Sequence, residues 1–238
     1  MELYLSWKKQ LDQNTTNIKG INDLVGASVK LCKVLGFDFF SYSICDTVPF
    51  TRPRIQILGN FPAQWLHCYE KNNYATVDPI IRHCRSSSET LRWYENLFKD
   101  CPQLWKDANK HHMRIGITQP SFNAGTCVGL LSLSRTKKAI SEIELKNLKP
   151  TIKAFTETFY SRASEFNKAL IPAAIIDLRQ KEKEILRWVA DGKTSEEIGR
   201  ILDVTADTVN FHIRNVQKKL GTCNRVQAVT YAVAQGYI

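Results

Sequence analysis

The side chains best suited to recognition chemistry gather on one face of residues 205–220. Laid out as a helix at 100° per residue, this stretch separates into an apolar side and a polar side. The polar side combines cations, an amide and an aromatic ring: Asn210, Phe211, Arg214 and Lys218. In a DNA major groove Arg pairs with guanine edges, Asn with adenine edges, and an apolar ring meets the thymine methyl group. This face therefore predicts a DNA-reading helix.

Two short helices joined by a tight turn are needed to position these side chains. Thr194 and Glu197 form a capping box that predicts the start of the first helix, and Thr205 is a suitable N-cap for the second. Thr205 and Thr208, at the start of the second helix, complete the predicted DNA contacts. The apolar side is expected to pack inward and consists of Val209, Ile213, Val216 and Leu220. The pattern favours a helix-turn-helix, and an ordinary helical hairpin with solvated charges is the alternative.

A second constellation lies in the first half of the chain and could bind a small molecule. Trp65, Tyr69, Asp78 and Trp93 fall close together in sequence, beside a predicted sheet that supplies Ser132. A mostly apolar pocket with a few convergent polar groups is the usual form of a small-molecule site. Aromatic residues at helical spacing also pack in cores, and more often do so. Spacing alone leaves both interpretations open.

The elements around these residues predict two domains. The first half alternates helices and strands, and the predicted helices cover 1–18, 21–35, 62–72, 102–112 and 141–160. Predicted strands cover 37–45, 54–58, 115–122 and 127–134, with a turn at 123–125. The fold class is α+β: an α-β-α sandwich with an antiparallel sheet over 1–164, a linker over 165–176, and an all-α, four-helix domain over 177–238.

Composition agrees with a polyanionic partner. The net charge is +10 and the pI about 9.3, but residues 173–238 contribute only +2 of it, so the charge does not mark the DNA-binding end. No apolar run is long enough for a membrane span, and no signal peptide is recognisable, so we expect a cytoplasmic protein without a membrane partner. The seven scattered cysteines indicate free thiols and no metal site.

The sequence also resembles a known family. The run from Lys181 to Gly221 is similar to the DNA-binding domain of LuxR-type regulators, with Glu182, Leu186 and Gly192 at characteristic positions, although Lys181 replaces the usual Arg. The first half resembles the autoinducer-binding domain of the same receptors. Its characteristic positions are all present: Trp65, Tyr69, Asp78, Pro79, Trp93 and Gly116.

The resemblance implies an N-acyl-homoserine lactone as the ligand and no other cofactor. Trp65 would donate to the lactone carbonyl and Asp78 would accept from the amide N–H. Tyr69 and Ser132 would bind polar groups near the acyl carbonyl, and the Trp93 ring would form the wall of the pocket around the head group. Phe61 stands where many of these receptors have Tyr, so one pocket hydroxyl is missing.

By the same resemblance, the protein would be a ligand-responsive transcription regulator that binds operator DNA as a homodimer and contacts RNA polymerase. An enzyme is disfavoured because no nucleophile motif supports catalytic residues. A phosphorylated response regulator needs an alternating strand-helix receiver, which residues 1–164 do not predict. A ligand-independent DNA-binding regulator of the same family remains the alternative.

Overall fold

The computed structural model describes residues 5, 9, 18–122, 127–166 and 176–238. The turn predicted at 123–125 lies outside these ranges. So does the helix predicted at 1–18, except for residues 5, 9 and 18, and so does most of the predicted linker. The chain divides into two compact units. The first includes the elements from α2 (Ile21–Val34) to α6 (Glu142–Phe166), and the second those from α7 (Gln180–Ala190) to α10 (Arg225–Ala234).

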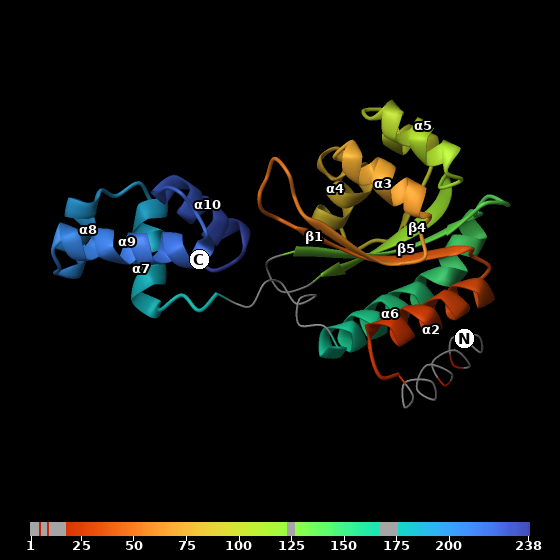
Figure 1. Ribbon diagram of the computed structural model, residues 1–238, viewed down its shortest axis with the longest axis horizontal. Coiled ribbons are helices and arrows are strands. Elements are labelled where there is room, and N and C mark those ends of the chain that lie inside the picture. The colour runs from red at the N-terminus through yellow and green to blue at the C-terminus, as the bar shows by residue number, and fades with distance from the viewer. Residues whose placement is uncertain (1–4, 6–8, 10–17, 123–126, 167–175) are drawn as a thin grey trace. The chain divides into compact units, whose positions relative to one another are not determined.

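A five-stranded antiparallel sheet forms the centre of the first unit (Figure 1). Its strand order is β2-β1-β5-β4-β3. The strands are β1 (Phe39–Asp46), β2 (Ile55–Gly59), β3 (Leu91–Arg92), β4 (Ile115–Phe122) and β5 (Cys127–Arg135). The central strands β1 and β5 pair over their whole lengths, with Ser41 opposite Ser132.

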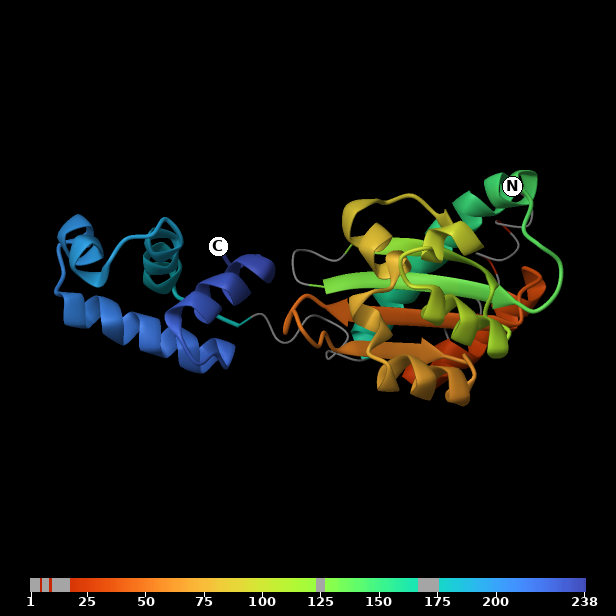
Figure 2. The same ribbon diagram turned by 90° about the horizontal axis from the view of Figure 1, so that it is seen from above.

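Helices cover both faces of this sheet, so the predicted α-β-α sandwich is confirmed (Figures 1 and 2). One face carries α2 (Ile21–Val34) and α6 (Glu142–Phe166), and the other carries α3 (Ala63–Lys71), α4 (Pro79–Ser86) and α5 (Pro102–Lys110). Each layer has its own apolar core. Phe40 and Tyr42 of β1 enter the core shared with α2 and α6, whereas Cys45 enters the core under α3, α4 and α5.

Some elements of this unit differ from those expected. The sequence predicts neither α4 nor β3, nor the 3₁₀ turns Tyr74–Thr76 and Glu95–Phe98. Helix α6 passes Pro150 as predicted but continues to Phe166, beyond the predicted domain end at 164. Buried apolar side chains of α6, among them Phe155 and Phe159, lie in the core as far along the helix as Ala163. This packing outweighs the missing N–H of one proline.

The second unit is the predicted four-helix domain. It consists of α7 (Gln180–Ala190), α8 (Ser195–Leu202), α9 (Ala206–Leu220) and α10 (Arg225–Ala234). Two predicted N-caps are confirmed: Thr194 accepts from the Glu197 N–H, and Thr205 from the Thr208 N–H. Asn224 caps α10 in the same way and accepts from the Gln227 N–H. The predicted inner side of α9 is buried as well.

The turn between α8 and α9 packs so closely against α8 that position 199 of that helix has no room for a side chain. A Cβ atom on Gly199 would lie 2.7 Å from the Val204 carbonyl oxygen, and Asp203 takes the left-handed conformation at φ 53°. At the other end of α9, Lys219 donates to the buried Glu182 carboxylate of α7 at 2.7 Å. These contacts fix the start and the end of α9 against the other helices.

Across the described residues no helix is long and apolar enough to cross a membrane. Within the same ranges, no three potential metal ligands come together. Six of the cysteines are free thiols: the buried Cys32, Cys45 and Cys84, together with Cys68, Cys101 and Cys223.

Candidate functional site

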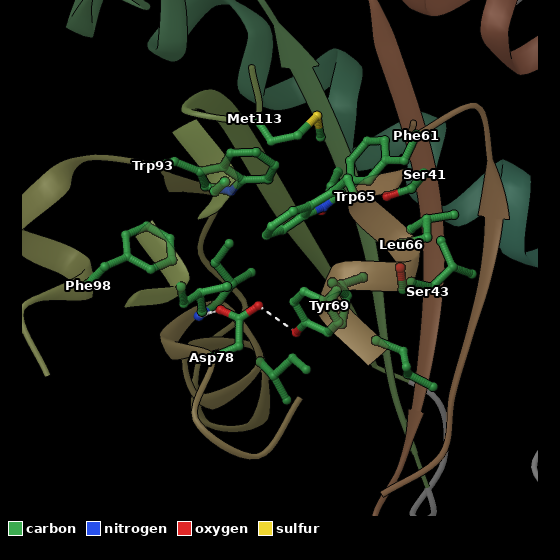
Figure 3. Close-up of a pocket in the computed structure, with 18 residues that line it drawn as sticks. Ser41, Ser43, Phe61, Trp65, Leu66, Tyr69, Asp78, Trp93, Phe98 and Met113 are labelled. Carbon is green, nitrogen blue, oxygen red and sulfur yellow. Dashed lines mark hydrogen bonds between the residues drawn. The ribbon is translucent and has the colours of Figure 1, made fainter. Parts of the chain in front are cut away.

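A pocket opens between the sheet and the helical layer of α3, α4 and α5 (Figure 3). It encloses about 600 Å³ of space, its opening to solvent included. The structure brings all the residues of the predicted ligand site to its lining: Phe61, Trp65, Tyr69, Asp78, Trp93 and Ser132. Apolar side chains such as Leu104, Met113 and Leu130 make up much of the remaining wall. This is the composition of a small-molecule site.

Asp78 is the carboxylate of this pocket and is held by two hydrogen bonds. The Tyr69 hydroxyl donates to Oδ2 at 2.7 Å, and the Ile80 backbone N–H donates to Oδ1 at 2.8 Å. The second bond makes Asp78 the N-cap of α4, with Pro79 in the first helical position. Asp78 therefore shapes the pocket as well as facing it.

Burial raises the pKa of the Asp78 carboxyl to about 6, although the hydrogen bonds from Tyr69 and Ile80 favour its charged form. Burial, and then the neighbouring Asp78 charge, raises the pKa of Tyr69 well above its ordinary value. Tyr69 is therefore a neutral donor at physiological pH. An ionised carboxylate that accepts two hydrogen bonds still has lone pairs for another donor.

Hydrogen bonds fix the Trp93 wall of the pocket. The Trp93 indole N–H donates to Thr118 Oγ1 at 2.9 Å, and Thr118 Oγ1 lies 2.8 Å from Ser132 Oγ. The face of the Trp93 ring lies against the backbone of β4, where a Cβ atom on Gly116 would come within 2.5 Å of Trp93. Only glycine leaves room for the ring at this position.

Aromatic contacts form the side opposite Trp93. The Trp65 and Tyr69 rings meet edge to face at 5.6 Å, and Tyr69 meets Tyr74 at 5.8 Å. Tyr74 is anchored in turn, because its hydroxyl donates to Asp107 at 2.6 Å. Figure 3 shows the Trp65 ring between Trp93 and Tyr69, above the Asp78 carboxylate. No described residue accepts a hydrogen bond from the Trp65 indole N–H, so this donor is available to a ligand.

The predicted DNA-reading face lies on α9, in the second unit. Arg214 and Lys218 are exposed, and 54 % of Phe211 is exposed, an unusual position for a large aromatic ring. Thr205 and Thr208 stand at the first turn of α9, where their hydroxyls lie 2.9 Å apart. An exposed face of this composition is suited to a major groove.

Asn210, a residue of the predicted DNA-reading face, also takes part in the packing of the domain. Its Oδ1 accepts a hydrogen bond from Ser195 Oγ at 2.7 Å, so its side chain connects α9 to the first residue of α8. Ser195 is buried. Asn210 therefore holds the two helices together, and its amide NH₂ is the part left to face outward.

Comparisons with known proteins find a matching family for each of the two units. Residues 21–163 match the family described as "Autoinducer binding domain", and residues 177–232 match "Bacterial regulatory proteins, luxR family". The chain belongs to the LuxR family of regulators. These proteins are transcriptional regulators and not enzymes, and the helix-turn-helix interpretation of α8 and α9 thereby holds over the hairpin alternative.

Full-length relatives support the same assignment. The chain is 42% identical to the transcriptional activator protein PhzR of Pseudomonas fluorescens, covering 98% of this chain and 96% of PhzR. It is 33% identical to the quorum-sensing regulator RhlR of Pseudomonas aeruginosa, covering 99% of this chain and 98% of RhlR. A crystal structure of Escherichia coli SdiA superposes with a TM-score of 0.74 at 30% identity, covering 98% of each chain. A structure of SdiA in complex with octanoyl-rac-glycerol superposes with a TM-score of 0.76.

Sequence reasoning missed several residues that line the pocket of this LuxR-family regulator. The most polar are Ser41 and Ser43 of β1. Their signal is the alternation of small and large residues in Phe40-Ser41-Tyr42-Ser43-Ile44, which places the serines on the face opposite Phe40, Tyr42 and Ile44. Because β1 is buried on both faces, the usual contrast between polar and apolar faces does not mark them.

Proposed function

We propose that the pocket of the first unit binds an N-acyl-homoserine lactone, and that the loaded protein binds operator DNA through α9. The observation that carries this proposal is the meeting of an indole donor, a carboxylate acceptor and a hydroxyl around one apolar cavity, in Trp65, Asp78 and Ser132. An acyl-homoserine lactone presents two carbonyls, one amide N–H and an alkyl chain. The pocket offers a complementary partner for each.

Each polar group of the ligand has a partner in this proposal. The Trp65 indole N–H, which no described residue occupies, donates to the lactone carbonyl. Asp78 accepts from the amide N–H while it keeps its bonds from Tyr69 and Ile80. Ser132, together with Tyr69, binds near the acyl carbonyl, and the Trp93 ring covers the head group.

The DNA-binding form in this proposal is a cytoplasmic homodimer. A helix-turn-helix dimer places its two reading helices in successive major grooves. Arg214, Asn210 and Phe211 would meet base edges, and Lys218, Thr205 and Thr208 would contact bases or phosphates at the ends of the same face. RNA polymerase would be a further partner, since the relative PhzR is named as a transcriptional activator.

A co-purification experiment tests the ligand. The full chain is expressed in cells fed a mixture of N-acyl-homoserine lactones, purified, and denatured, and the released small molecules are identified by mass spectrometry. We expect one lactone at a stoichiometric amount in the wild type and much less in Trp65→Ala. A well-folded wild-type protein that releases no lactone would favour the ligand-independent alternative. Release of an acylglycerol instead would point to the kind of molecule seen in SdiA.

A further inference from the structure

Helix α5 supplies part of the pocket wall and is joined to the neighbouring helices by one buried carboxylate. Its Leu104 and Ala108 side chains line the pocket. Asp107 lies on the same helix and is buried, but it is not part of the lining. Among the described residues, one hydrogen bond connects α5 to the segment from α3 to α4, and it runs from the Tyr74 hydroxyl to Asp107.

Three donors surround the Asp107 carboxylate. The Tyr74 hydroxyl donates to Oδ2 at 2.6 Å, Gln103 Nε2 donates to the same oxygen at 3.1 Å, and Lys110 Nζ donates to Oδ1 at 2.7 Å. The hydrogen bonds from Lys110, and then from Tyr74 and Gln103, hold the pKa of Asp107 well below its usual range. A charged acceptor strengthens the hydrogen bond that it receives, so Asp107 holds the Tyr74 side chain firmly.

Tyr74 transmits this constraint to the pocket through ring contacts. It meets Tyr69 edge to face, with the ring centroids 5.8 Å apart, and Tyr69 meets Trp65 in the same way. Both tyrosines are buried, and a close-packed ring cannot turn unless its neighbours move. The Tyr69 hydroxyl therefore keeps its direction toward Asp78 Oδ2 (Figure 3) as long as Tyr74 stays in place.

We infer that Asp107 is a positioning residue for ligand recognition, acting through Tyr74 and Tyr69 on the acceptor Asp78. This inference rests on the proposed function. Neither Asp107 nor Tyr74 lines the pocket, so each acts on a ligand only through its neighbours. Loss of the Tyr74 hydroxyl should free the Tyr69 ring and weaken its hydrogen bond to Asp78.

The pH profile of binding reports this link, whereas a general loss of packing would leave the profile in place. The Tyr69 hydrogen bond favours the charged form of Asp78, so weakening it raises the pKa of that carboxyl. In the proposed function the ligand needs the charged carboxylate, so the midpoint of the binding profile rises as well. Burial raises the pKa of each neighbouring thiol, at Cys45, Cys84 and Cys101, so these groups stay neutral in this window.

Calorimetric titration of the full chain between about pH 5 and 8 tests the link. The probe is whichever of N-butanoyl-, N-hexanoyl- and N-octanoyl-homoserine lactone binds the wild type most tightly. Tyr69→Phe removes the hydrogen bond to Asp78 outright and should raise the midpoint by about 0.4–1 pH unit. We expect Tyr74→Phe and Asp107→Ala to raise the midpoint too. Tyr69→Phe combined with Tyr74→Phe should raise it no further than Tyr69→Phe alone.

Tyr74→Phe carries the test even where Asp107→Ala does not fold. It keeps the ring, and it keeps the backbone hydrogen bond in which the Asp78 N–H donates to the Tyr74 carbonyl at 2.9 Å. The matched control is Tyr42→Phe, which removes a buried tyrosine hydroxyl that donates to Ser121. The Tyr42 ring lies in the core shared with α2 and α6, so this variant should keep the wild-type midpoint.

The outcomes separate this inference from the proposed function. An unchanged midpoint in Tyr74→Phe would overturn the positioning role and leave the proposed function intact. So would midpoint shifts that add in the Tyr69→Phe, Tyr74→Phe double variant, because Tyr74 would then act by another route. Lactone binding that does not depend on pH in the wild type would remove Asp78 as the charged acceptor, and the inference with it. Wild-type protein that binds no lactone would overturn both.

Discussion

At the scale of single residues, Asp78 is the centre of the pocket because it does two things at once. One carboxylate oxygen caps α4 and the other accepts from Tyr69. A loss of function after its removal could therefore reflect a damaged helix as well as a lost ligand contact. Substitutions that separate the two roles are needed.

We expect Asp78→Asn and Asp78→Ala to differ in folding but not in binding. Asn is as good an N-cap as Asp, so Asp78→Asn should keep the cap of α4. Asp78→Ala should lower the free energy of unfolding by about 0.5–2 kcal/mol. Both should weaken lactone binding by about 1–3 kcal/mol, because the ligand amide N–H loses its acceptor. Calorimetric titration measures this, and wild-type affinity in Asp78→Asn would show that the carboxylate is not the acceptor.

The pKa of Asp78 predicts opposite pH trends for stability and binding. The pKa rises from about 3.9 in the unfolded chain to about 6 in the fold, so between these values the native state holds more protons than the unfolded state. The contribution of Asp78 to stability without ligand therefore falls as pH rises through this window. Lactone affinity should fall as pH drops below about 6, because the amide N–H needs the charged carboxylate. Binding measured from pH 5 to 7.5 should show this slope in the wild type and not in Asp78→Asn.

At the scale of elements, α9 presents a DNA-reading face and also packs against α8, and residues one helical turn apart serve these two roles. Arg214 projects into solvent, whereas Asn210 bonds to Ser195 of α8. The same substitution should therefore have different effects at the two positions.

Arg214→Ala should keep the melting temperature and lose about 1–3 kcal/mol of discrimination between operator and unrelated DNA. Asn210→Ala should in addition lower the free energy of unfolding by about 0.5–1.5 kcal/mol, because the hydrogen bond from the Ser195 hydroxyl is lost. Arg187→Ala, at an exposed Arg of α7, is the matched control for charge. DNA affinity at fixed salt and thermal unfolding measure both effects. An Arg214 variant with wild-type discrimination would contradict the assignment of the reading face.

The elements also show what could be predicted from sequence. The caps at Thr194, Thr205 and Asn224, and the inner side of α9, depend on residues close in the chain and were predictable. Helix α4 is short, and the two-residue strand β3 is defined by its pairing with β4. The periodicity of the local sequence therefore does not predict either element. The pairing of Ser41 with Ser132 and the Asn210–Ser195 hydrogen bond depend on residues that only the fold brings together. The domain boundaries at 164 and 177 stay predictions.

At the scale of the whole molecule, the account requires that a small molecule in the first unit changes DNA binding by the second. A ligand that binds only the folded state stabilises it by mass action, about 2.7 kcal/mol at one hundred times its dissociation constant. If the ligand also favours the dimer, operator affinity rises with ligand concentration. Coupling of this kind is reciprocal, so operator DNA should raise lactone affinity by the same factor.

The most direct test measures operator affinity with and without ligand. DNA sites are first selected from a random library by the full chain in the presence of lactone, and affinity is then measured by fluorescence anisotropy at fixed salt. We predict that saturating lactone raises the operator affinity of the wild type at least fivefold, the lower range of ordinary allosteric coupling, about 1 kcal/mol. At the same concentration Asp78→Asn should respond weakly or not at all. Equal operator affinity of the wild type with and without a lactone that it demonstrably binds would contradict the account.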